Sequence, residues 1–114
     1  LLAKDQWINN SKERLHRFLR ALTEAAQFIE NEPESARQII HEKFQLEDDY
    51  SQYVWQKHKI RLELPQSLFF SMEEKARWLI ENKLVDAETI PEMLDFIRPG
   101  PLNIVNPSAV TIVK

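Results

Sequence analysis

The chain has 114 residues, 43% hydrophobic and 29% charged, a composition typical of one small soluble globular domain. Its net charge of -3, with 15 Lys and Arg interleaved among 18 Asp and Glu, gives no basic patch for nucleic acid or an anionic membrane surface. The absence of cysteine excludes a disulfide framework, a thiolate nucleophile and a Cys-based metal site. Gly100 is the one glycine, so phosphate-cradling loops and dinucleotide folds, which need several, are excluded as well.

The first half of the chain reads as a series of helices. We expect residues 1–3 to be the end of a strand and residues 5–8 to form a short helical turn. Asn10 or Ser11 is a suitable N-cap for a long helix that runs to about Asn31. Its apolar residues recur at helical spacing on one face: Leu15, Phe18, Leu19, Leu22, Ala25, Ala26 and Ile29.

Pro33 ends the long helix and suits the first turn of a second one. Asp48 is expected to cap a third, short helix. The second helix has the apolar residues Ala36, Ile39, Ile40 and Phe44, and the third runs through Tyr50, Tyr53, Val54 and Trp55.

The second half begins with an alternating pattern. Residues 57–64 place Ile60, Leu62 and Leu64 against charged neighbours, which predicts a short extended segment that Pro65 ends. A strong helix is expected over residues 68–83. Pro91 starts a short helix through Ile97, the Pro99-Gly100-Pro101 run ends it, and residues 110–113 read as a terminal strand. The pattern therefore predicts a single domain over residues 1–114, mainly α with about five helices and short central and terminal extended segments.

The polar residues do not form a recognisable catalytic or metal-binding motif. His16, His41 and His58 lack the spacing that places metal ligands on one helix face, so they are predicted to be surface histidines. The serines include no Gly-flanked nucleophile elbow. We assign no catalytic, cofactor-binding or metal-binding residue, expect no cofactor, and predict that the chain is not an enzyme. Helix-end capping is the role expected of the clustered carboxylates Glu30, Glu32, Glu34, Glu47, Asp48 and Asp49.

Six aromatic residues have two interpretations. They could line a ligand pocket, or they could pack in the core and against neighbouring layers, which is the more common use of such side chains. Packing is favoured, and the ligand-binding residues stay unknown. The six are Tyr50, Tyr53, Trp55, Phe69, Phe70 and Trp78.

Five motifs in order, from about Arg17 to the end of the chain, resemble one known family. They are a long-helix motif over residues 18–26, an Asn-Glu-Pro-Glu-Ser-Ala break over residues 31–36, Trp55 followed by the stretch of residues 60–64, a helix carrying Ala76-Arg77-Trp78, and a Pro-Ser-Ala-Val-Thr-Ile-Val tail over residues 107–113. Together they resemble the carboxyl-terminal part of the solute-binding proteins of bacterial ABC importers for nitrate, sulfonates, taurine and related compounds.

The resemblance implies a fragment of an α/β two-lobed periplasmic-binding-protein (type II) fold, in which the ligand lies between the lobes. It implies non-catalytic capture of a small-molecule solute and its delivery to an ABC permease, in a periplasmic or extracytoplasmic membrane-associated location. Residues 1–4 would lie near a crossover strand, and the helices would pack largely on the first lobe. The chain starts with neither Met nor a signal-peptide pattern, and we expect it to be a carboxyl-terminal segment of a longer protein.

Helices that cover a parallel sheet keep an apolar face that needs that sheet. We therefore expect the isolated segment to expose part of this face and either to self-associate or to rearrange its helices. The residues concerned are Phe18, Leu22, Ile29, Ile39, Ile40, Trp78 and Ile80.

Two alternatives stay open. The chain could be an independent helical interaction or extracytoplasmic sensor module. It could also belong to the scaffold of the thiamine-pyrimidine synthases, which share this fold, although their reactive cysteine motif has no counterpart here.

Overall fold

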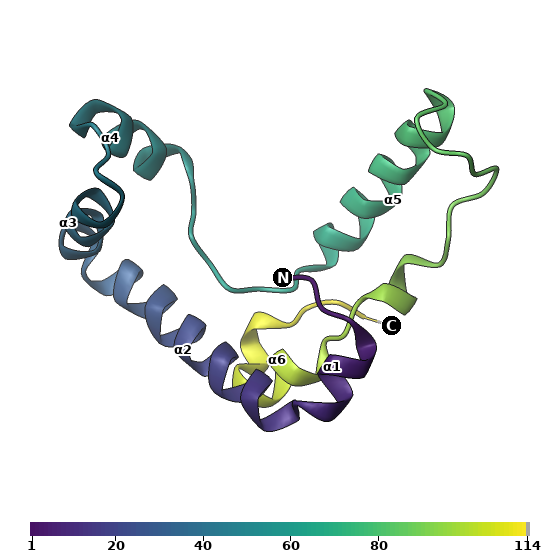
Figure 1. Cartoon of the computed structure of the whole chain (residues 1–114), viewed down its shortest axis with the longest axis horizontal. Helices are drawn as coiled ribbons and strands as arrows, with labels where there is room; N and C mark the ends of the chain where they lie inside the picture. Colours follow the sequence, from purple (N-terminus) through teal and green to yellow (C-terminus); the bar gives the residue numbers. More distant parts are fainter. Residues whose placement is uncertain (114) are drawn as a thin grey trace. The chain divides into compact units, whose positions relative to one another are not determined.

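A computed structural model describes residues 1–113, and these are mainly helical, as the sequence predicts (Figure 1). The α-helices and the short 3₁₀ helices follow one another in the order α1 (Asp5–Asn10), α2 (Lys12–Asn31), α3 (Pro33–Phe44), α4 (Asp48–Lys57), α5 (Gln66–Glu81), η1 (Met93–Phe96), α6 (Gly100–Val105) and η2 (Pro107–Ala109).

The chain forms two compact units, described separately here. The first unit contains residues 1–16 and the chain from Glu63 onward, and the second unit is Arg17–Leu62. The expectation of a single domain stays a prediction, because units of this kind are defined by local contacts and not by independent folding.

In the second unit, prolines and a left-handed residue set the helix boundaries. Pro33 occupies the first turn of α3, where its missing N–H removes no helical bond. Gln45 ends α3 in the left-handed conformation with φ of 51°, and its backbone N–H donates to the His41 carbonyl. The next helix, α4, begins three residues later and packs against α3. Each of these two helices buries one small residue, Ala36 and Ser51, which are both 3% exposed.

In the first unit, a small apolar core forms around the carboxyl-terminal segments. α5 contacts η1, and α6 contacts η2. An ion pair joins Arg98 Nη2 to Asp5 Oδ2 at 3.1 Å, which ties the segment after η1 to α1. The buried side chains are Met93, Ile97, Leu102 and Ile112.

Where the sequence predicts strands, the described residues form only one isolated parallel bridge, between Leu64 and Val110. Leu64 N donates to Ala109 O at 2.8 Å, and Thr111 N donates to Leu64 O at 3.1 Å. Elsewhere in residues 57–64 and 110–113, and in residues 1–3, the described chain has no strand. These predictions were wrong in extent because a strand needs a neighbouring strand to which it hydrogen-bonds. Period-two alternation indicates only that a segment favours an extended conformation.

The prolines near residue 100 begin a helix as well as ending one. The helix expected from Pro91 is the 3₁₀ helix η1, and the helix expected over residues 68–83 runs from Gln66 to Glu81. The predicted stop at Pro99-Gly100-Pro101 is also the start of α6, which the sequence analysis missed. Pro101 lies at the start of α6, where a missing N–H is tolerated.

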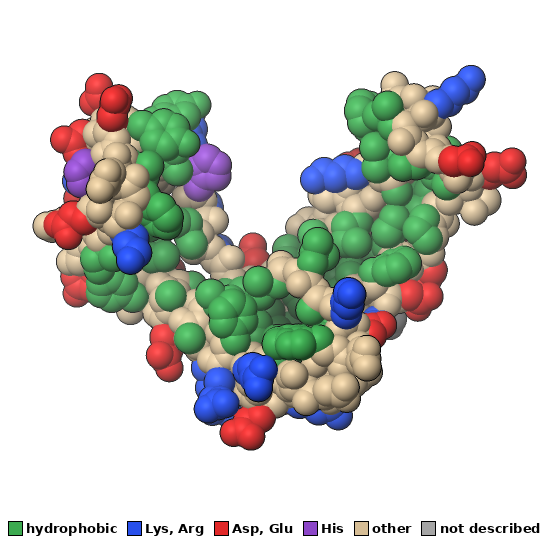
Figure 2. Space-filling view, viewed as in Figure 1, with side chains coloured by type: hydrophobic (Ala, Val, Ile, Leu, Met, Phe, Trp, Pro, Cys, Tyr) green, Lys and Arg blue, Asp and Glu red, His purple; other side chains and the backbone are tan. Residues whose placement is uncertain are grey.

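Apolar side chains reach the surface of both units, as Figure 2 shows for one face of the molecule. On α2, Leu19 is the buried member of the predicted apolar face, and Phe18 remains 48% exposed. None of the seven residues expected to be uncovered without a sheet is buried: Phe18, Leu22, Ile29, Ile39, Ile40, Trp78 and Ile80.

Candidate functional site

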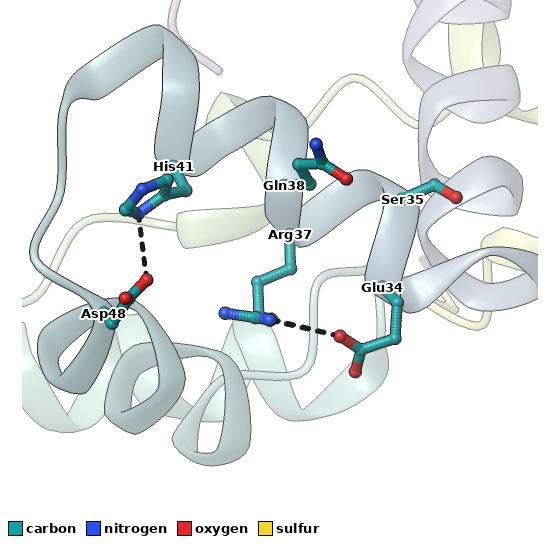
Figure 3. Close-up of a pocket in the computed structure, with 6 residues that line it drawn as sticks. All are labelled: Glu34, Ser35, Arg37, Gln38, His41 and Asp48. Atoms are coloured by element: carbon teal, nitrogen blue, oxygen red, sulfur yellow. Dashed lines mark hydrogen bonds and ion pairs between the residues drawn. The ribbon is translucent and has the colours of Figure 1, made fainter.

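One hollow lies in the second unit and is lined by α3 and the start of α4. We call it the α3–α4 hollow, and its volume is about 300 Å³. Its lining is polar and carries both signs of charge: Glu34, Ser35, Arg37, Gln38, His41 and Asp48 (Figure 3).

Three of the lining side chains already have partners on α3. Arg37 Nε and Nη2 both donate to Glu34 Oε2, at 3.3 and 3.2 Å. Gln38 Nε2 donates to Glu42 Oε1 at 2.9 Å. These are partners three and four residues apart, the usual neighbours on one helix face. The side chains of Arg37 and Gln38 therefore already have hydrogen-bond partners within α3.

His41 and Asp48 face each other across the turn between α3 and α4 (Figure 3). His41 Nδ1 is 3.6 Å from Asp48 Oδ1, a separation beyond a hydrogen bond. The Nδ1 atom is itself inaccessible and has no hydrogen-bond partner among the described residues. Asp48 is 86% exposed, so an ion pair with a protonated His41 would be strongly screened by water.

The hollow contains a serine, a histidine and an aspartate, but they are not arranged as a catalytic triad. Ser35 points away from His41 and Asp48 (Figure 3). A nucleophile must lie within hydrogen-bond reach of its base, which this arrangement does not provide. What the hollow offers chemically is an open, polar surface with mixed charge.

Neither of the other two histidines lines this hollow. His58 Nδ1 lies 3.0 Å from Val54 O at the end of α4. His16 lies in α2. No group of three or more His, Asp or Glu among residues 1–113 is placed to hold a metal ion.

The carboxylates predicted as caps lie at helix ends, but their side chains do not cap by hydrogen bonding. Glu32 and Glu47 occupy the N-cap positions of α3 and α4 without a side-chain bond to the helix amides. Asp48, predicted to cap α4, is instead the first residue of that helix, followed by Asp49. A carboxylate in a first turn interacts favourably with the helix dipole, which applies to Glu34, Asp48 and Asp49. Glu30 instead lies in the last turn of α2, where the dipole disfavours a negative charge.

The aromatic residues divide between a second hollow and open surface. Trp55 lines a hollow of about 270 Å³ together with Glu34, Arg37, Gln52 and Gln56, all in the second unit. Phe69 and Phe70 meet edge to face at a centroid distance of 5.5 Å. The predicted packing is mostly absent, because four of the six aromatic residues are more than half exposed: Tyr50, Tyr53, Phe70 and Trp78.

Sequence reasoning missed the two pairs that join separate segments. These are Arg98 with Asp5, and His41 with Asp48. The first pair is 93 residues apart along the chain and carries no local signal. The second pair, His41 and Asp48, forms because the last turn of α3 and the first turn of α4 lie close together.

No protein-family model, curated protein or solved structure matches the chain. Within residues 1–113, no helix is both long enough and apolar enough to span a membrane.

Proposed function

We propose that the chain is the carboxyl-terminal part of the substrate-binding component of an ABC importer for nitrate-, sulfonate- or taurine-like solutes. Its role is non-catalytic: the complete protein captures a solute outside the cytoplasmic membrane and delivers it to the permease. The observation that carries the proposal is the order of the five motifs between Arg17 and Val113.

Two features of the structure support it. The motif Asn31-Glu32-Pro33 falls at the junction of α2 and α3. The long helices α2 and α5 keep apolar residues uncovered, including Phe18 and Trp78 at 48% and 56% exposure. Helices that cover one face of an α/β sheet have such faces.

The experiment is to read the open reading frame that encodes this segment and to compare it with the intact mass and amino-terminal sequence of the purified protein. A much longer frame with a secretory signal supports the proposal, and titration of that full-length protein with nitrate, taurine and an alkylsulfonate then identifies the solute class. A frame that encodes this segment alone contradicts it.

A second candidate is an independent helical interaction module, favoured by the aromatic side chains that lie open on α4 and α5. Tyr53 and Phe70 are 61% and 56% exposed. An upstream lobe encoded in the parent gene separates the two ideas, because the first candidate requires it and the second does not. The pyrimidine-synthase scaffold has less support, because the α3–α4 hollow does not pair a nucleophile with a base.

A further inference from the structure

The two ends of α5 are closed in different ways. At the carboxyl-terminal end, Lys83 adopts the left-handed conformation with φ of 54°, and its N–H donates to Ile80 O at 2.9 Å. Leu84 N donates to Leu79 O, also at 2.9 Å. These two bonds form a Schellman motif, which uses only residues next to the helix end. This end of α5 therefore closes without distant residues.

The amino-terminal end of α5 has no local side-chain cap. Its N-cap residue is Pro65, which offers no side-chain acceptor to the first amides of the helix, and the first turn carries no acidic residue. The Gln66 amide instead donates to Thr111 Oγ1 at 3.4 Å, across 45 residues of sequence. None of the residues of α5 is buried, so packing contributes little to the order of this end. The start of α5 thus depends on the segment around Thr111.

Two side chains extend the parallel bridge between Leu64 and Val110. In a regular parallel ladder, the residue two positions after Leu64 would donate to the Thr111 carbonyl and accept from the Val113 amide. That residue is Gln66, whose backbone already belongs to α5. Its amide donates to Thr111 Oγ1 instead, and its own Oε1 accepts from Val113 N at 2.8 Å. A side-chain oxygen therefore replaces each of the two backbone acceptors.

These replacements make residues 110–113 easier to detach than a strand of a sheet. Both bonds of Gln66 lie in exposed surroundings, where a single hydrogen bond adds little to stability. Ile112 is the buried residue of this segment, and it keeps 9% of its surface exposed. Segments held by so few buried contacts open locally at a small cost in free energy, before the rest of the structure unfolds.

We propose that residues 110–113 form a strap that closes over the start of α5 and opens as a unit of its own. The closed strap caps the first turn of α5 through the bond between Gln66 and Thr111. When the strap opens, this turn loses its cap and Ile112 leaves the core, while the self-capped end of α5 stays helical. The inference concerns contacts within the first unit alone, so it does not rest on the proposed function.

The test measures amide hydrogen exchange of the whole chain by NMR, at several urea concentrations below the unfolding transition. The bonded amides of Leu64, Thr111 and Val113 report on the strap. The slowest amides of the first unit report on its global unfolding. We expect the strap amides to exchange faster than these and with a much weaker dependence on urea, because a local opening exposes little surface.

Three variants test the side-chain bonds. Thr111 is exposed, and Thr111→Val removes its hydroxyl at nearly constant volume, so exchange at Gln66 and Val113 should become about three- to tenfold faster. Thr111→Ser keeps the hydroxyl and should retain the wild-type rates. The matched control is Ser108→Ala, which removes a hydroxyl that donates to the nearby Asn106 Oδ1 at 2.7 Å, and it should change neither rate.

Three results would overturn the proposal. Unchanged exchange at Gln66 and Val113 in Thr111→Val would show that the strap does not cap α5. Equal acceleration of the slowest amides in that variant would show that the segment separates only when the whole unit unfolds. An equal urea dependence of the strap amides and the slowest amides would lead to the same conclusion.

Discussion

Leu102 offers the sharpest test of the small core in the first unit. Its side chain is 4% exposed and lies in α6, a helix of six residues. Ile104 lies two positions later on the same helix and is 64% exposed. Truncating each to alanine removes an aliphatic side chain from one helix, once from the core and once from the surface.

The two substitutions should differ several-fold in their cost to the free energy of unfolding. Leu-to-Ala changes in well-packed cores cost about 2.7–5 kcal/mol, and the cost falls where neighbours can close the gap. The surrounding core is small, and Met93 and Ile97 keep 8% and 6% of their surface exposed. We therefore expect Leu102→Ala to cost about 2–3 kcal/mol, and Ile104→Ala less than about 0.5 kcal/mol.

Urea unfolding followed by the far-UV circular dichroism of the helices measures both values. In the background Trp7→Phe/Trp55→Phe, the fluorescence of the remaining Trp78 reports on α5 of the same unit and checks that the unit unfolds together. Equal midpoints for the two variants would refute the assignment of Leu102 to a core. So would a larger loss for Ile104→Ala.

Three further changes test the second unit and one long-range pair. Gln45→Gly should raise the free energy of unfolding by about 0.5–1 kcal/mol in urea titrations, because φ is 51° there and glycine removes the left-handed strain; Gln45→Ala, which keeps a Cβ, should not. Ala36→Leu should cost about 1–3 kcal/mol by overpacking a residue that is 3% exposed, and a similar loss in the control Ser35→Leu, on the exposed side of α3, would contradict this. Arg98→Gln should lose less than about 1 kcal/mol, and a double-mutant cycle with Asp5→Asn should assign that loss to their ion pair; zero coupling energy would show that the pair contributes nothing to stability.

The helices were largely predictable from the sequence because their signals are local. The apolar spacing of α2 and the proline at the start of α3 fix those elements within a few residues. The extent of the strands and the presence of α6 were not predictable, since each depends on contacts with residues that are distant in the sequence. Leu64 finds Val110 across 46 residues, and no local pattern encodes that pairing.

The sequence indicated individual residues of the α3–α4 hollow but not that they lie together. His41 and Asp48 were each noted as a surface histidine and a capping carboxylate, and the turn at Gln45 brings them together. That turn depends on a left-handed conformation at a non-glycine residue, which propensity disfavours. The mostly exposed aromatics Tyr53 and Trp78 illustrate a second limit, because sequence indicates an apolar residue but not what covers it.

The division of the chain into two units has a consequence for synthesis on the ribosome. The second unit is one continuous run, Arg17–Leu62, so all of it has been synthesised before Glu63 is added to the chain. The first unit needs both its early residues and the late core residues Leu102 and Ile112. Its opening segment, including Asp5, must therefore wait for Arg98 to be synthesised. The order in which the units become complete is thus the reverse of the order in which they begin.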